Sequence, residues 1–302
     1  MTRVVDLFAG WGGFSLGAER AGCEVVYAAN HWPLAVEVHA RNHPRARHEC
    51  QDLQQADFTG LPDYDLLIAS PACQGNSRAS QPRRRKYHDE LRSTAWAVVE
   101  CADVTEPRAI IVENTIDLRR WRLYESWCAA LRALGYHVAE HLVQASTLGV
   151  PQRRLRLFVT ATRRPLPSLD LPVLDELPFG PCVDELAAGW RLVRSAPAPV
   201  QERIARGRAR CGRRFLSQHT TDHQGVPLDE PIRTITTKNH WNLVDGDMYR
   251  SLTERELARG MDLPDGFTWP DVDKNTAIKG LGNAVPPGMG AHVIRSVLAG
   301  TR

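Results

Sequence analysis

The sequence lacks the features that mark a secreted or membrane-bound protein. None of its apolar runs approaches the roughly 20 residues that a helix needs to cross a bilayer. The first strand-like run begins at residue 3, so we expect no signal peptide. The seven cysteines are an odd number and include no C-x-x-C pair, which is typical of reduced thiols in a cytoplasm. We therefore expect a cytoplasmic protein without a membrane partner.

The chain also lacks a strong charge imbalance, since 38 Lys and Arg residues stand against 35 Asp and Glu residues. The distribution of charge says more than the net value. Basic residues cluster at 83–86, and six arginines lie between positions 203 and 214. Such clusters are either solvated faces or contacts to nucleic-acid phosphates, where guanidinium groups displace counterions.

Strand-like and helical patterns alternate over the first 160 residues. We predict strands at 3–8, 24–29, 65–69, 108–114 and 155–161, and helices at 14–22, 33–42, 93–104 and 121–135. This alternation predicts an α/β fold with a doubly wound, mostly parallel sheet. Ligands bind such sheets at the carboxyl ends of the strands, near a topological switch point.

The pattern changes after residue 163. Residues 164–248 are rich first in proline and then in arginine, and they end in short strand-like runs. Helical patterns return at 253–261, where Thr253 and Glu256 have the spacing of a capping box, and at 288–299. We expect an α/β domain over 1–163, a small inserted domain over 164–248, and a segment over 249–302 that returns to the first domain.

A glycine-rich turn, "DLFAGWGG", follows the first predicted strand. Its glycines permit a tight turn and a close approach of a ligand to the backbone. The turn has neither P-loop nor G-x-G-x-x-G spacing, so it indicates either a nucleotide-like cofactor or only a tight turn. Trp32 and Asp52 follow the next two strand-like runs, where an indole could stack on adenine and a carboxylate could bind its amino group.

Three other strand ends carry reactive side chains. Cys73 lies in a loop after the strand at 65–69, and a thiol at a rim can be a nucleophile, whereas an inert thiol usually fills a core. Glu113 ends the strand at 108–114, from which a carboxylate can transfer a proton. Gln152, Arg154 and Arg156 are predicted to share one face of a strand, where their burial would require a charged partner.

A group of histidines and a cysteine could suggest zinc, but its spacing matches no usual ligand pair. We expect no metal and interpret two of the histidines, His39 and His43, as an exposed helix end. The group is His39, His43, His48 and Cys50.

The ordered motifs resemble the cytosine-C5 DNA methyltransferase family of bacterial or phage type. The resemblance rests on "DLFAGWGG", "SPACQGNS", "VENT", "QRRLRLF", "LTERELARGMDLPD" and "GLGNAVPP", whereas 164–248 corresponds only in position. It implies a Rossmann-like methyltransferase that transfers a methyl group from S-adenosylmethionine to C5 of a cytosine flipped out of double-stranded DNA, with S-adenosylhomocysteine as product.

The resemblance also assigns roles to residues. Cys73 would add to cytosine C6, Glu113 would hold and protonate N3, and Arg156 would bind the base carbonyl oxygen. Arg154 would support this group. The implied cofactor-binding residues are Phe8, Gly10, Gly12, His31, Trp32, Asp52, Ser93, Thr94 and Asn283.

Residues 164–248 would then be the target-recognition domain, reading base edges in the major groove. DNA contacts are expected from the loop after Cys73 and from the arginine-rich stretch: Gln74, Ser77, Arg83, Arg84, Arg85, Arg208, Arg210 and Arg213. The implied partner is double-stranded DNA, and a companion restriction endonuclease is a candidate partner. We expect a monomer that is associated with the nucleoid when it is bound to DNA.

Several positions depart from the family's pattern. Ala72 replaces a proline, Asn76 stands where an aromatic is common, and Thr115 replaces a valine. His31 stands where an acidic residue usually binds the ribose hydroxyls, so it could bind the same hydroxyls or fit a donor with an extra anionic group. Two other functions stay open: tRNA methylation by the same chemistry, and DNA binding without catalysis. The arginine-rich inserted domain favours DNA methylation.

Overall fold

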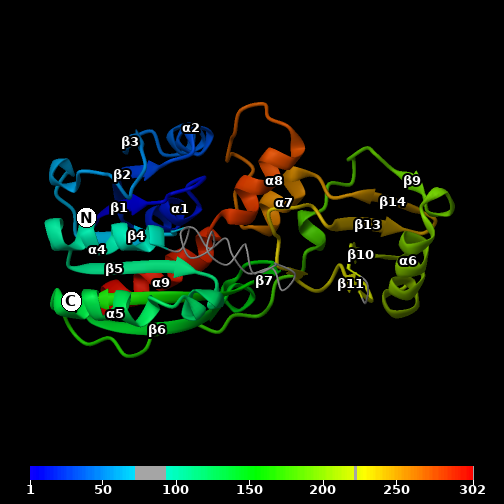
Figure 1. The fold of residues 1–302 in the computed structure, drawn as a ribbon. Helices are drawn as coiled ribbons and strands as arrows, with labels where there is room; N and C mark the ends of the chain where they lie inside the picture. The colour runs from blue at the N-terminus through cyan, green and yellow to red at the C-terminus, as the bar shows by residue number, and fades with distance from the viewer. Residues whose placement is uncertain (72–92, 221–222, 302) are drawn as a thin grey trace. The chain divides into compact units, whose positions relative to one another are not determined.

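The computed structural model describes residues 1–71, 93–220 and 223–301, which form two compact units (Figure 1). Unit 1 comprises residues 1–144, 155–172 and 284–302, and unit 2 comprises 145–154 and 173–283. The expected inserted segment lies in unit 2 from residue 173 onward. Unit 2 also contains residues 249–283, which we had grouped with the C-terminal segment.

Unit 1 is built on a seven-stranded sheet with the order β3-β2-β1-β4-β5-β8-β6. The first five strands of this order are parallel, and β8 and β6 are antiparallel to their neighbours. The mostly parallel, doubly wound sheet is therefore confirmed. The strands are β1 (Arg3–Leu7), β2 (Glu24–Asn30), β3 (Arg47–Cys50), β4 (Leu66–Ala69), β5 (Ala109–Asn114), β6 (His137–Gln144) and β8 (Leu155–Thr162).

Helices cover both faces of this sheet. On one face, α4 (Trp96–Thr105) and α5 (Tyr124–Ala133) pack on a core that includes Leu157 and Val159 of β8. Phe158 points to the opposite face, where its ring meets Phe14 of α1 (Gly13–Arg20) at a centroid distance of 6.1 Å. The C-terminal helix α9 (Pro287–Gly300) packs against α1. Two covered faces explain why β4 and β5 are buried along their full length.

The strand order of unit 1 reverses beside β1, because β2 pairs with one of its edges and β4 with the other. This reversal is the topological switch point, where the carboxyl ends of neighbouring strands leave a crevice for a ligand. The glycine-rich turn leaves β1 at this point, and the chain that leads to Cys73 leaves β4.

Unit 2 contains an antiparallel sheet with the order β11-β10-β13-β14-β9 and a separate pair, β7 and β12. Its strands are β7 (Gln152–Arg153), β9 (Arg191–Leu192), β10 (Arg214–Gln218), β11 (Val226–Pro227), β12 (Ile232–Arg233), β13 (Trp241–Asp245) and β14 (Met248–Ser251). The arginine-rich stretch forms a helix, α6 (Ala198–Cys211), that lies on this sheet through Ile204. No helix among the described residues is long and apolar enough to span a membrane.

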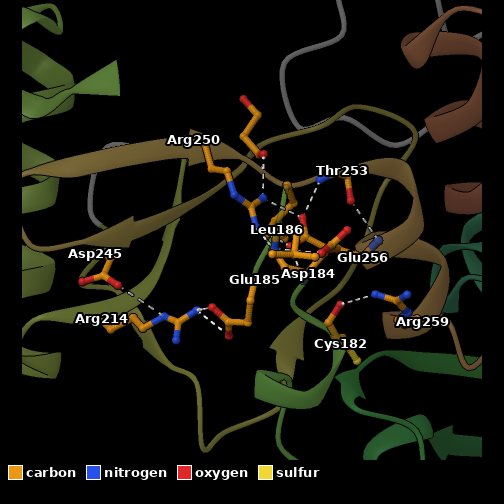
Figure 2. Close-up of polar contacts among 12 residues, drawn as sticks. Cys182, Asp184, Glu185, Leu186, Arg214, Asp245, Arg250, Thr253, Glu256 and Arg259 are labelled. Atoms are coloured by element: carbon orange, nitrogen blue, oxygen red, sulfur yellow. Dashed lines mark hydrogen bonds and ion pairs between the residues drawn. The ribbon is translucent and has the colours of Figure 1, made fainter. Parts of the chain in front are cut away.

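A buried ion pair fixes the helix α7 (Glu254–Gly260) to β14 in unit 2 (Figure 2). Arg250 and Glu256 are both inaccessible to solvent, and the Arg250 Nη2–Glu256 Oε1 distance is 2.6 Å. The predicted capping box of Thr253 and Glu256 is present, and Glu256 also accepts a hydrogen bond from the Asp184 backbone N–H. Burial alone would raise the pKa of Glu256, but the hydrogen bonds from Arg250 and the backbone of Thr253 and Asp184 lower it.

Candidate active site

The glycine-rich turn at the end of β1 has an unusual backbone. Phe8, Gly10 and Gly12 have φ angles of 59°, 55° and 90°, all in the left-handed region. A Cβ atom on Gly10 would lie 3.9 Å from the Phe8 carbonyl oxygen, an ordinary van der Waals contact, so the described residues do not crowd its backbone. A Cβ atom on Gly13 would instead lie 2.2 Å from the Val285 carbonyl oxygen, so α1 lies close to the residues that precede α9. The turn therefore presents bare backbone at the switch point.

A buried group of histidines lies under this turn. His43 Nε2 lies 3.1 Å from the Gly12 carbonyl oxygen, and His43 Nδ1 lies 2.9 Å from Glu19 Oε1. His39 contacts Ser15 Oγ at 2.9 Å. His39 and His43 are almost completely buried, so our interpretation of an exposed helix end was wrong. Among the described residues, no group of three or more His, Cys, Asp and Glu side chains has a geometry that could hold a metal ion.

The network continues to Asp6, in the centre of β1. Ser15 donates a hydrogen bond to Asp6 Oδ2 at 2.7 Å. Burial raises the pKa of the Asp6 carboxyl to about 7, although its hydrogen bonds to Ser15 act in the opposite direction. Burial also lowers the pKa of His39, helped by the charges of His43 and His48. A neutral carboxyl and a neutral imidazole can stay buried beneath the turn at low cost.

Three of the expected cofactor-binding residues lie at the carboxyl ends of β2 and β3, which are neighbours. His31 and Trp32 follow β2, and the Trp32 N–H donates to Asn30 Oδ1 at 2.9 Å as α2 (Pro33–Asn42) begins. Asp52 follows β3 and accepts from the Gln54 N–H at 3.1 Å. His31 and Asp52 are exposed and Trp32 is half-buried, so all three can meet a ligand.

Two further candidates lie at the start of a helix in unit 1. Ser93 and Thr94 form a short 3-10 turn, Ser93–Ala95, that leads into α4. The last cofactor candidate, Asn283, is an exposed residue that ends α8 (Lys274–Asn283) in unit 2.

Glu113 and Arg156 form an ion pair across the β5–β8 edge. The Arg156 Nε–Glu113 Oε1 distance is 3.1 Å, and 13% and 8% of the two side chains are exposed. Next to this pair, Asn114 is buried and donates from Nδ2 to the Pro71 carbonyl oxygen at 3.0 Å. Because Pro71 precedes Cys73 by two residues, this bond ties the start of the cysteine segment to the end of β5.

Arg154 does not share a strand face with Arg156, contrary to our prediction. The strand is interrupted between β7 and β8, and Arg154 belongs to unit 2 while Arg156 belongs to unit 1. Arg154 is buried and donates to the carbonyl oxygens of Ile235 and Gly282, at 2.9 and 3.0 Å. Carbonyl oxygens, rather than a charged side chain, receive these hydrogen bonds.

Several of the expected residues lie outside the part of the chain that the structure describes. They are the expected nucleophile and the DNA contacts of the loop that follows it: Cys73, Gln74, Ser77, Arg83, Arg84 and Arg85.

The arginine-rich stretch of unit 2 is partly neutralised by acidic side chains. Arg208 lies 3.3 Å from Asp247 Oδ1, and Arg213 Nε lies 3.0 Å from Asp245 Oδ1. Arg214 lies between Glu185 and Asp245, as Figure 2 shows. Arg210 is exposed in the last turn of α6. The charge that remains for DNA phosphates is therefore smaller than the count of arginines suggests.

Sequence reasoning missed the residues that hold the site together. No role was predicted for Asn114, and His39 and His43, which lie under Gly12, were predicted to form an exposed helix end. The signal that could have found the histidines is the spacing of His39 and His43, four residues apart on one helix face.

The fold is that of solved methyltransferase structures. The structure is similar to that of the S. pombe Dnmt2 methyltransferase, with a TM-score of 0.72 and 18% identity over 99% of this chain and 98% of that one. It is also similar to the Entamoeba histolytica methyltransferase EhMeth, with a TM-score of 0.74 and 14% identity over 100% and 99% of the two chains. At these identities, the likeness establishes the fold alone.

The chain belongs to the C-5 cytosine-specific DNA methylase family, whose model matches residues 2–177 and 194–299. Type II methyltransferase M.AplI of Arthrospira platensis is 30% identical over 97% of this chain and 85% of its own length. M.HgiDI of Herpetosiphon aurantiacus is 34% identical over 53% of this chain. The match spans about half, 52%, of the length of M.HgiDI. These findings confirm the resemblance noted in the sequence.

Proposed function

We propose that the protein methylates C5 of cytosine in double-stranded DNA, with S-adenosylmethionine as donor and a covalent bond between Cys73 and cytosine C6. The observation that carries this proposal is the Glu113–Arg156 pair at the carboxyl end of β5, in a chain of this family. A partly shielded carboxyl and guanidinium match the acceptor atoms N3 and O2 of one cytosine. Asn114 anchors the chain that leads to Cys73 beside this pair.

The chemistry requires electrons to move through the base. When the Cys73 thiolate bonds to C6, the displaced electron pair makes C5 nucleophilic, and protonation by Glu113 at N3 prevents negative charge from building up. Arg156 holds the O2 oxygen and orients the ring. After the methyl group bonds to C5, loss of the C5 proton and breakage of the C6–sulfur bond regenerate the thiolate.

The residues at the switch point suit S-adenosylmethionine, which supplies a methyl group on a positively charged sulfur. The cofactor would lie against the backbone of the turn that Phe8, Gly10 and Gly12 form, where a Cβ atom on Gly10 would make only an ordinary contact at 3.9 Å. Trp32 offers an aromatic face to adenine, and Asp52 offers a carboxylate to its amino group. His31 would meet the ribose, and Ser93, Thr94 and Asn283 the methionine end. Arg154, through its bonds to Ile235 and Gly282, would hold these segments of unit 2 together.

We further propose that the protein acts as a modification enzyme on duplex DNA. Its relatives M.AplI and M.HgiDI are type II methyltransferases. Arg210, which is exposed on α6, and the arginines at 83–85 are the phosphate contacts of this proposal. A companion endonuclease would recognise the same DNA site.

Nucleoside mass spectrometry of plasmid DNA from cells that express the protein tests this function. We expect 5-methylcytosine with the wild type, none with Cys73→Ser, and at least a 100-fold lower rate with Glu113→Gln, because general acid catalysis contributes about 10²–10⁴. Both variants should still bind DNA. Methylation by Cys73→Ser would disprove the covalent route, and methylation of tRNA in place of DNA would disprove the substrate. A cytosine adduct of another mass would indicate a different donor.

A further inference from the structure

One face of the five-stranded sheet in unit 2 changes from apolar to polar within two residues. Under α6 it carries a cross-strand row of Phe215, Val244 and Tyr249, which pack on Ile204. The next row on the same face carries polar side chains: Ser217 of β10, Asn242 of β13 and Ser251 of β14. A row of polar side chains in this position requires an explanation, because burying them is costly.

Two members of the polar row are buried, and one of them lacks a hydrogen-bond partner among the described residues. Ser217 and Asn242 are 1% and 2% exposed. Ser251 Oγ donates to Asn242 Oδ1 at 3.2 Å, and Asn242 Nδ2 lies 2.7 Å from His219 Nε2. Ser217 Oγ has no hydrogen-bond partner among the residues that the structure describes. The row therefore ends at an exposed histidine, His219, that a buried amide holds in place.

The contact with Asn242 decides which ring nitrogen of His219 carries hydrogen. In this orientation the amide nitrogen of Asn242 can only donate, so His219 Nε2 accepts and the proton of the neutral ring lies on Nδ1. Partial burial of the ring, together with the charges of Arg203 and His240, lowers the pKa of His219, which favours the neutral ring, although the hydrogen bond to Asn242 acts in the opposite direction. His219 thus offers a single, oriented N–H donor.

We propose that His219 reads a purine in the DNA target, donating its Nδ1 hydrogen to N7, or to O6 where the purine is guanine, at the major-groove edge. These atoms are acceptors in a groove where each base pair presents a distinct pattern. Asn242 and Ser251 act as positioning residues, because a donor that is held by buried partners loses little freedom on binding. The inference rests on the proposed function and adds the residue that specifies sequence.

The arginines of the same unit support this division of roles. Arg208, Arg213 and Arg214 are engaged with carboxylates, so they are poorly placed to form the bidentate contacts that arginine makes with guanine. An exposed neutral donor elsewhere in this unit carries little attraction for phosphates and can discriminate between bases.

Selection of duplexes from a random DNA library by the full-length protein tests the proposal, since selection measures binding and needs no methyl transfer. The selection compares the wild type with His219→Ala. The matched control is His137→Ala, which removes an exposed histidine in unit 1. The wild type should prefer a purine at one position of the selected site. In His219→Ala we expect this preference to be about 10-fold weaker, at that position only, because one good base contact contributes about that much discrimination. His137→Ala should select the same site as the wild type.

A second measurement separates a base contact from a phosphate contact. Replacing the purine at that position by its 7-deaza analogue should weaken binding of the wild type and leave binding of His219→Ala unchanged, if N7 is the acceptor. A uniform loss of affinity in His219→Ala with a shallower salt dependence would show a phosphate contact and overturn base reading. An unchanged site in His219→Ala, or no selected site with the wild type, would also overturn it. A selected site without methylation would instead disprove only the catalytic proposal.

Discussion

At the scale of single residues, Asp6 makes folding depend on pH. Its carboxyl is completely buried and has a pKa of about 7, whereas an exposed aspartate has its usual 3.8. Between these two values the folded state binds the proton and the unfolded state does not, so the free energy of unfolding falls as the pH rises from about 4 to 7. The fall is on the order of 4 kcal/mol and levels off above the folded-state pKa.

The variant Asp6→Asn should remove this contribution, because an amide has the same shape, can accept from Ser15 and does not titrate over this range. We expect the difference in free energy of unfolding between wild type and variant to change with pH by about 4 kcal/mol, in favour of the variant at neutral pH. Urea denaturation at several pH values measures it. A difference independent of pH would show that Asp6 is ionised in the folded protein.

At the scale of elements, the turn between β1 and α1 depends on Gly12 for two reasons. Its φ of 90° disfavours a side chain, and a Cβ would lie 2.5 Å from His43 Nε2. Gly12→Ala should lower the free energy of unfolding by about 2–4 kcal/mol. This value is the sum of the cost of a left-handed backbone conformation at alanine and the cost of overpacking against His43. It should also weaken binding of S-adenosylmethionine.

Gly22→Ala is a matched control, since Gly22 has a similar φ of 83° but nothing within 4 Å of its Cβ position. We expect it to cost about 1–2 kcal/mol, from the backbone alone, without a change in cofactor affinity. Equal effects of the two variants in denaturation and in calorimetric titration with the cofactor would rule out a role for the histidine contact.

The Arg250–Glu256 pair, which joins β14 to α7, should act as a coupled unit. Replacing either residue alone, by Arg250→Met or Glu256→Leu, leaves a buried charge without its partner and should cost about 3–5 kcal/mol. The double variant should cost less than the sum of the two, with a coupling on the order of 2 kcal/mol. For the more exposed Arg259–Asp265 pair, the same double-mutant cycle should give less than about 1 kcal/mol.

At the scale of the whole molecule, the stability of unit 1 depends on residues from both ends of the chain. Ile294 of α9 is completely buried in a unit that begins with β1. Ile294→Ala should therefore lower the free energy of unfolding by about 2–5 kcal/mol. Leu186→Ala, at a side chain that is 94% exposed, should change it by less than about 0.5 kcal/mol. Chemical denaturation monitored by circular dichroism compares the two, and similar effects would contradict the packing of α9.

The sequence by itself determined the features that depend on neighbours along the chain. Hydrophobic periodicity located β1, β2, β4, β5 and β8, and helix α2 agrees with its predicted limits of 33 and 42. The capping box of Thr253 and Glu256 was predicted because its two residues are three positions apart. The order of short motifs gave the family, since each motif is local.

Only the tertiary structure decided which distant side chains meet. It joined Glu113 to Arg156, placed Arg154 in the other unit, and paired Arg213 and Arg214 with acidic side chains from other segments. It also buried the histidines beneath Gly12 and aligned Ser217, Asn242 and Ser251 in one row. These contacts depend on strand order and register, which bring together residues far apart in the chain and leave no local signal in the sequence.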